Sequence, residues 1–131
     1  MAVGYSRAVQ VGPYVAVAGT TGSGPAGDIA AQAEDALRRI EIALQQAGAS
    51  LTDVLRTRIY VTDISRWREV AAVHARVFGR IRPAATMVEV SALIAPELLW
   101  RSKPTPTWSR RKGPEDLRPA QMFPRDPANK R

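Results

Sequence analysis

Residues 28–61 read DIAAQAEDALRRIEIALQQAGASLTDVLRTRIYV, and this stretch decides the fold. Its first part is typical of an amphipathic helix, because Asp28 is a good N-cap and Gly48 is a good residue at which a helix ends. Between them, apolar side chains recur at helical spacing and therefore share one face. This face consists of Ile29, Ala33, Ala36, Leu37, Ile40, Ala43, Leu44 and Ala47.

The second part of the stretch predicts a turn and then a strand. Residues 50–53 (SLTD) can form a capped turn. Residues 54–61 alternate in the manner of a strand with one packed side, and Arg56 and Arg58 fall on the polar face. The packed face would carry Leu55, Thr57, Ile59 and Val61.

Two further strands are predicted upstream of this stretch. Residues 5–11 alternate moderately, and residues 14–18 form a short apolar run after a Gly-Pro turn signal. Residues 19–25 read as a loop, and their three glycines do not have the spacing of a phosphate-binding loop.

A second helix and another strand are predicted downstream. Asp63 or Ser65 caps a helix that carries Trp67 and Phe78, and residues 84–90 again have a strand pattern. The expected fold class is α+β, with the order β-β-α-β-α-β and two helices on one face of a mixed sheet. Because the apolar positions serve both faces of the sheet, we expect an oligomer to cover the second face.

Composition excludes several classes of function. The chain has 131 residues, no Cys and one His, so we expect a single domain without disulfides, a thiolate metal site or a cysteine nucleophile, and a zinc site is disfavoured. No apolar run is long enough for a membrane span, and no signal-peptide pattern is present, which predicts a cytoplasmic protein.

The composition changes abruptly after Leu99. Residues 1–99 contain 10 Arg, no Lys and 9 acidic residues, whereas residues 100–131 contain 9 Lys or Arg, 3 acidic residues and six of the ten prolines. Proline disfavours both helix and central strand, so the sequence predicts a folded domain over residues 1–99 and an extended or disordered tail over residues 100–131.

The tail has two interpretations. It can be a natural basic arm, which would bind nucleic acid through phosphate charge. It can also be out of frame: residues 99–108, LWRSKPTPTW, can be encoded so that one inserted base after the first codon gives Leu-Val-Glu-Ile-Glu-Ala-Asp-Ala-Asp-Val. This alternation of apolar and acidic residues is typical of a half-buried strand, and we favour the frameshift.

Several short segments resemble the RidA/YjgF family of small trimeric proteins, and their order and spacing make the match specific. The resemblance covers nearly all of residues 4–99, and it includes the family's last strand, Val-Glu-Ile-Glu-Ala, only in the shifted frame. The matching segments are residues 4–9 (GYSRAV), 17–19 (VAG), 47–54 (AGASLTDV), 60–63 (YVTD) and 83–90 (PAATMVEV).

The resemblance implies a chorismate-mutase-like fold and a homotrimer with pockets between subunits. The best-known members hydrolyse reactive enamines and imines, such as 2-aminoacrylate, to 2-keto acids and ammonia without a metal or an organic cofactor. An arginine binds the substrate carboxylate, and a glutamate from the last strand positions or activates water. A metal-independent enamine/imine deaminase is therefore the leading expectation for this chain.

Only part of the family's site is matched. The ligand-binding positions fall on Tyr5, Gly19, Thr20, Thr86 and Met87. The family glutamate falls after residue 99, where the written frame has no matching acid, so no catalytic residue is assigned.

Two departures change the expected ligand. The position of the substrate-binding arginine is Ala85, and the position of the pocket asparagine is Ala71. Because alanine cannot bind a carboxylate, the chain resembles a divergent subfamily that keeps the scaffold and changes the ligand. A non-catalytic small-molecule-binding or regulatory trimer is the alternative function, and RNA binding or endoribonuclease activity, acting through the basic tail, is less favoured.

Other polar and aromatic residues have structural as well as functional interpretations. His74 is expected to be a hydrogen-bonded core or interface residue rather than an acid or base, and Trp67 is expected in the core or an interface. Glu89 is expected to pair with Arg56 or Arg58 of the neighbouring strand. The two arginines are also candidates for an anion-binding role, although solvated charges on a sheet are more common.

Overall fold

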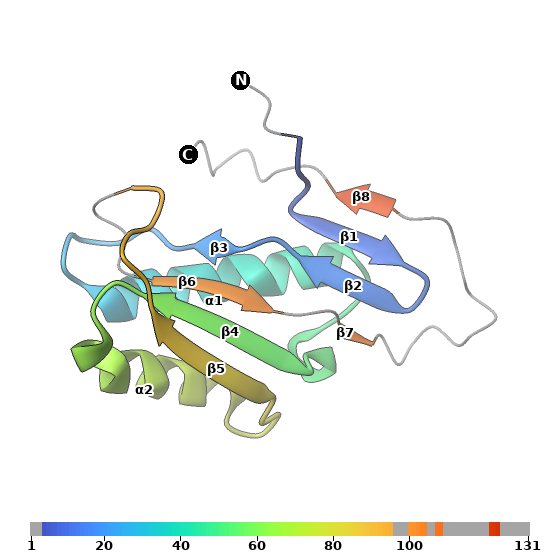
Figure 1. The fold of residues 1–131 in the computed structure, drawn as a ribbon. Coiled ribbons are helices and arrows are strands. Elements are labelled where there is room, and N and C mark those ends of the chain that lie inside the picture. Colours follow the sequence, from blue (N-terminus) through green and yellow to red (C-terminus); the bar gives the residue numbers. More distant parts are fainter. Residues whose placement is uncertain (1–3, 96–99, 105–106, 109–120, 124–131) are drawn as a thin grey trace.

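The computed structural model describes residues 4–95, 100–104, 107–108 and 121–123 (Figure 1). Within these residues the chain forms strands, two α-helices and two short 3-10 helices. The helices are α1 (Ile29–Gln46), η1 (Leu51–Asp53), η2 (Ile64–Arg66) and α2 (Trp67–Phe78). The strands are β1 (Ala8–Val11), β2 (Tyr14–Val17), β3 (Thr20–Thr21), β4 (Arg56–Val61), β5 (Ala84–Glu89), β6 (Trp100–Pro104), β7 (Thr107–Trp108) and β8 (Gln121–Phe123).

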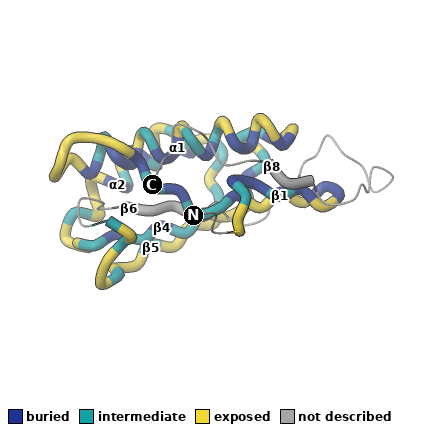
Figure 2. The backbone as a smooth tube through the Cα atoms, turned by 90° about the horizontal axis from the view of Figure 1, so that it is seen from above, coloured by how far each residue is buried: buried dark blue, intermediate teal, exposed yellow. Residues whose placement is uncertain are grey.

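The strands form two sheets, with the orders β7-β2-β1-β8 and β3-β6-β4-β5. β4 and β5 are parallel, whereas β6 is antiparallel to both β3 and β4. Figure 2 shows α1 on one side of the strands, and Figure 1 shows α2 running alongside β4 and β5 on that same side. The α+β class, the mixed sheet and the single layer of two helices are thus confirmed.

The helix α1 forms as its sequence predicts. The Asp28 side chain accepts a hydrogen bond of 3.0 Å from the amide of Ala31, and Gly48 follows the helix with a positive φ of 76°. Gln32 is also buried, although its position was not among the predicted apolar face. The apolar face of α1 packs on strand residues that include Val15, Ile59 and Val61, and together these form the core.

Several element boundaries differ from the predictions. The first strand begins at Ala8, so Tyr5 lies outside it, and the expected loop over residues 19–25 contains the short strand β3. Leu55 precedes β4 and is 60% exposed, so its place on the packed face was wrong. Asp63 caps η2, which leads directly into α2, and the capped turn predicted over residues 50–53 is confirmed.

Strands also form in the described parts of residues 100–131, for which the sequence predicts an extended or disordered tail. Trp100–Pro104 forms β6 between β3 and β4, and the short strands β7 and β8 pair with β2 and β1. A strand ladder is made by main-chain groups, so unfavourable side chains do not prevent it. Pro104 is the last residue of β6, so its missing amide affects only the end of the ladder with β4. The domain boundary after Leu99 stays a prediction.

The approach of the loop after β3 to α1 depends on Gly22. This residue is buried, and a Cβ atom on it would overlap the carbonyl oxygen of Gln32 and lie 2.7 Å from the amide nitrogen of Ala36. The next residue, Ser23, donates its amide to Asp35 of α1 at 2.8 Å. The loop therefore lies directly on the helix backbone, with no room for a side chain at residue 22.

We predict that Gly22→Ala lowers the free energy of unfolding by about 3 kcal/mol, because helix and loop must separate to admit the methyl group. Urea denaturation followed by circular dichroism measures the loss. Gly27→Ala is the matched control: residue 27 has open space around it and a φ of 80°, so only backbone strain of about 1 kcal/mol is expected. Equal losses for the two variants would show that the close approach does not matter.

Candidate functional site

A cavity of about 230 Å³ opens between α2 and the sheet edge formed by β5. Helix α2 contributes residues at positions i, i+3 and i+4, which lie on one face of a helix. Strands β4 and β5 contribute the floor. The lining residues are Ile59, Ala71, His74, Ala75, Ala85, Thr86 and Met87. The space exists because three of the lining residues are alanines, whose side chains leave it unfilled.

His74 is the lining residue with an ionisable side chain. Its Nε2 lies 3.0 Å from the hydroxyl oxygen of Thr57, which is on the buried face of β4. Its ring also packs against Phe78, with 4.7 Å between the ring centroids. Thr57 is in register with Ala85 on β5, so the hydrogen bond fixes the imidazole over the floor of the cavity. The hydrogen bond expected for His74 is confirmed.

Burial lowers the pKa of His74 below its ordinary value. The imidazole is therefore neutral at pH 7. Because the other lining residues of the cavity are not ionisable, its described walls are uncharged at that pH.

The predicted ligand-binding residues lie in two places in the single chain. Thr86 and Met87 line the cavity. Tyr5, Gly19 and Thr20 do not line it. Thr20 is fully buried, where its hydroxyl accepts a hydrogen bond from Arg7 and donates one to the carbonyl of Ala18. The structure thus brings two of the five residues to the cavity.

The expected pairing of Glu89 with Arg56 or Arg58 was wrong. Glu89 is in register with Val61, at the opposite end of β4 from Arg56, and its carboxylate accepts a hydrogen bond from the amide of Ile64. It does not pair with Arg56 or Arg58 in the described part of the chain. Trp67 is 43% exposed and lies outside the core of the single chain, and the guanidinium of Arg68 stacks over its ring at 4.7 Å. Its alternative place in an interface stays a prediction.

The sequence did not identify His74 as a cavity residue, because nothing in the sequence of α2 alone shows that its ring faces a cavity. The useful signal was the spacing of Ala71, His74 and Ala75, which places two small side chains beside one imidazole on the same helical face. Among the described residues there is no cluster of side chains that could hold a metal ion, and no helix could cross a membrane.

The profile of the family described as Endoribonuclease L-PSP matches residues 1–99. The chain belongs to the RidA/YjgF family. It is 37% identical over 95 residues to a RutC family protein of Pyrococcus abyssi, with 68% of this chain and 75% of that protein covered. The family match ends at Leu99, the residue at which the composition changes.

Two other relatives bear on fold and chemistry. A crystal structure of a YjgF/YER057c/UK114 family member from Mycobacterium tuberculosis has a TM-score of 0.77 and 70% identity, and the match covers 81% of this chain and 87% of that one. The human protein named 2-iminobutanoate/2-iminopropanoate deaminase is 30% identical, over 68% of this chain and 69% of its own length. The Mycobacterium tuberculosis structure supports the assignment of a RidA/YjgF fold to the described residues of this chain.

We predict that the imidazole of His74 titrates with a midpoint below 6.5, because burial disfavours its charged form. The chain has one histidine, so its imidazole signal in an NMR pH titration is assigned without ambiguity. The unfolded chain binds this proton more readily than the folded chain. The contribution to stability is therefore complete above about pH 6.5 and is lost as the pH falls through the lowered pKa.

His74→Gln is the control for this titration, since it removes the proton-binding group and keeps a polar side chain. Urea denaturation of the variant should lose the part of the pH dependence that falls just below pH 6.5. A midpoint at or above that of a free histidine, or an unchanged pH dependence in the variant, would contradict the burial of the ring.

Proposed function

We propose that the protein hydrolyses small reactive imines or enamines in the cavity between α2 and β5. The observation that carries the proposal is the cavity itself: it is small, mostly apolar, and contains one neutral imidazole held by a buried hydroxyl. Membership of the RidA/YjgF family and the name of the human relative, an imine deaminase, support this reaction class.

The chemistry required is modest. Water adds to the carbon of the C=N bond, a proton reaches the nitrogen, and the resulting carbinolamine expels ammonia to leave a carbonyl compound. The apolar walls would limit bulk water around the reactive carbon, and the cavity would hold the C=N group at a fixed place. The step consumes one water and releases one ammonia, so it needs no redox partner.

In this proposal the cavity is completed in a cytoplasmic homotrimer. Arg56 and Arg58 alternate with the buried residues of β4 and so lie on its other face. Exposed apolar side chains lie on or next to these strands: Leu55, just before β4, is 60% exposed, and Val88 of β5 is 41% exposed. An apolar surface of this kind beside a sheet edge is suited to contact with further copies. Tyr5, which is 42% exposed, and Gly19 would reach a neighbouring copy's cavity in such an assembly, whereas Thr20 is buried within its own chain.

The described walls of the cavity include no carboxylate that could activate water. Strand β6 reads Trp-Arg-Ser-Lys-Pro and includes no carboxylate. A shift of one base would place Val-Glu-Ile-Glu-Ala on these same five residues of a strand between β3 and β4. Its two glutamates would be in register with Tyr60 and Arg58, on the face of the sheet opposite Ile59, so in this proposal they would act at the contact with a neighbouring copy. We therefore propose that the functional protein carries the shifted frame, and the end of the family match at residue 99 supports this.

The alternative is a trimer that binds a small molecule without turnover. It is favoured by one observation, that no carboxylate lines the cavity among the described residues. The family's description, and that of a solved structure from Thermotoga maritima, also name endoribonuclease activity. The excess positive charge that would attract RNA lies in residues 100–131, so we rank this function below the other two.

We predict that the gene, sequenced through the codons for Glu97 to Arg110, contains one base more than the written frame requires. The reason is physical: the shifted frame gives an alternating strand suited to a place inside a sheet, and the written frame does not. The mass of the protein purified from its native host provides an independent check. If both measurements return the written frame, the catalytic proposal loses its acid and the binding function takes its place.

We predict that Ala71→Leu lowers ammonia release from a panel of imines, generated in place by amino-acid and amine oxidases, by about tenfold or more, because the added carbons fill the cavity. Ala72→Leu is the matched control, since residue 72 is exposed, neighbours Ala71 on α2 and does not line the cavity. Ammonia is measured with a coupled dehydrogenase. Full activity of Ala71→Leu, or equal losses for both variants, would place the reaction elsewhere.

A further inference from the structure

The described walls of the cavity contain few polar groups. Ile59, Ala71, Ala75 and Ala85 present hydrocarbon, and Met87 adds a thioether. Thr86 is in register with Arg58, and successive strand residues point to opposite faces, so residue 86 lines the cavity with its backbone. His74 is thus the polar side chain that faces a ligand from the described walls.

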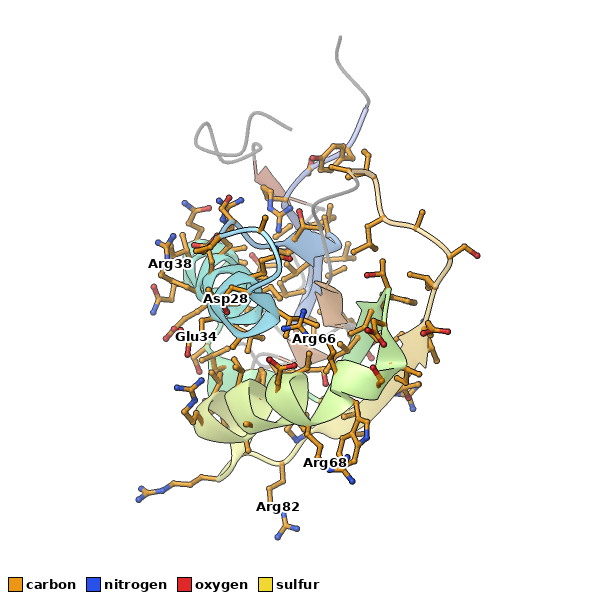
Figure 3. The ribbon with its side chains drawn as sticks, turned by 90° about the vertical axis from the view of Figure 1, so that its left-hand side faces the viewer. Asp28, Glu34, Arg38, Arg66, Arg68 and Arg82 are labelled. Carbon is orange, nitrogen blue, oxygen red and sulfur yellow. The ribbon has the colours of Figure 1, made fainter. Side chains whose placement is uncertain are left out.

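The charged side chains around the cavity interact with other residues or point away from it. On α2, Arg68 stacks on the ring of Trp67, and Arg76 forms an ion pair of 2.6 Å with Glu34 of α1. Figure 3 shows Arg68 on the outer side of α2 and Arg82 extending away from the molecule. Neither residue is in the lining of the cavity.

The same holds for the remaining charges of these elements. Arg66 and Glu69 are paired with each other at 2.8 Å, and Glu89 accepts a hydrogen bond from the backbone. Arg56 and Arg58 lie on the face of β4 opposite the buried Thr57 and Ile59. Within residues 4–95, therefore, no Arg or Lys side chain lines the cavity to neutralise an anionic ligand.

We propose that the cavity selects a small uncharged carbonyl or imine compound and rejects the corresponding carboxylate, with the His74–Thr57 pair supplying the hydrogen bond that holds the ligand. The inference rests on the proposed function in taking this cavity as the substrate site, but binding alone tests it. A carboxylate that enters an apolar cavity without a partner loses its hydration and gains nothing in return, whereas an amide or imine loses far less.

The hydrogen-bonding capacity of His74 follows from its tautomer. A neutral imidazole has one donor and one acceptor nitrogen. The Thr57 hydroxyl is hydrogen-bonded to Nε2 of His74, and in the described part of the chain the ring has no second hydrogen-bond partner. If Thr57 donates, Nδ1 carries the proton and donates to a ligand oxygen or nitrogen; if Thr57 accepts, Nδ1 accepts from an N–H. In both cases the pair offers the ligand one hydrogen bond.

The volume limits the size of the ligand. A dry protein cavity of about 150 Å³ accommodates benzene. The cavity here measures about 230 Å³, so a compound of up to roughly ten non-hydrogen atoms fits in the single chain. Small acyclic carbonyl and imine compounds meet this limit.

The test uses two isosteric probes, 2-oxobutanamide and 2-oxobutanoate, which differ in charge and hardly in shape. Isothermal titration calorimetry on the full chain is expected to show binding of the amide at least about tenfold tighter than binding of the carboxylate. His74→Leu should weaken amide binding, because the hydrogen bond to the ligand is lost while the apolar volume remains.

Ala85→Arg provides the decisive variant, since it introduces a guanidinium opposite His74 and should reverse the preference between the two probes. Ala84→Arg is its matched control: residue 84 is the preceding position of β5, is exposed, and does not line the cavity. Its preference should stay that of the unchanged protein.

Three results would overturn the inference: tighter binding of 2-oxobutanoate by the unchanged protein, the same reversal in Ala84→Arg, or no binding of either probe at millimolar concentration. These outcomes are separate from those of the ammonia assay. Amide binding without ammonia release retains the inference and removes the hydrolase proposal. Ammonia release with a preference for the carboxylate retains the hydrolase and removes the inference.

Discussion

The parallel pairing of β4 and β5 is the constraint on which the candidate site depends. Parallel neighbours cannot be joined by a tight turn, so the chain must cross over the sheet, and here α2 makes that crossing. The crossing sets α2 over β4 and β5, and the register of Thr57 with Ala85 brings a hydroxyl and a small side chain beneath the same helical turn. His74 then bonds to Thr57, and the alanines around it leave the cavity.

The cavity and the charged surface are separated by the alternation of the strands. On β4 the buried positions Thr57 and Ile59 face α2, whereas Arg56 and Arg58 face away. A shift of the strand register by one residue would exchange these two sets of side chains and would put guanidinium groups beside His74. The neutrality of the described walls is therefore a property of the whole strand pairing, not of His74 alone. Burial of the imidazole reinforces it, because the lowered pKa keeps the ring neutral at pH 7.

The sequence predicted those parts of the fold in which local pattern and packing agree. The apolar spacing of α1 and its Asp28 cap are strong local signals, and both appear in the structure. Local pattern could not predict the cavity, because Ala71 and Ala85 are separate in sequence and meet only through the crossover; the family resemblance, not the pattern, assigned both to pocket positions. Glu89 shows the same limit: its partner was inferred from neighbouring strands, but the register, which the sequence does not specify, placed it beside Val61 and the amide of Ile64.

Strand β6 shows that the fold depends on backbone pairing, whereas the function depends on which side chains the strand carries. Its ladders to β3 and β4 are made by backbone groups, which every residue except proline supplies, so the segment Trp-Arg-Ser-Lys-Pro takes the place of a strand. Chemistry depends instead on which side chains the strand carries. In the proposed shifted frame the same backbone pairing would be open to residues 100–104, while their side chains would differ. For this reason a fold shared with RidA/YjgF proteins supports the scaffold here but does not by itself supply an acid to activate water.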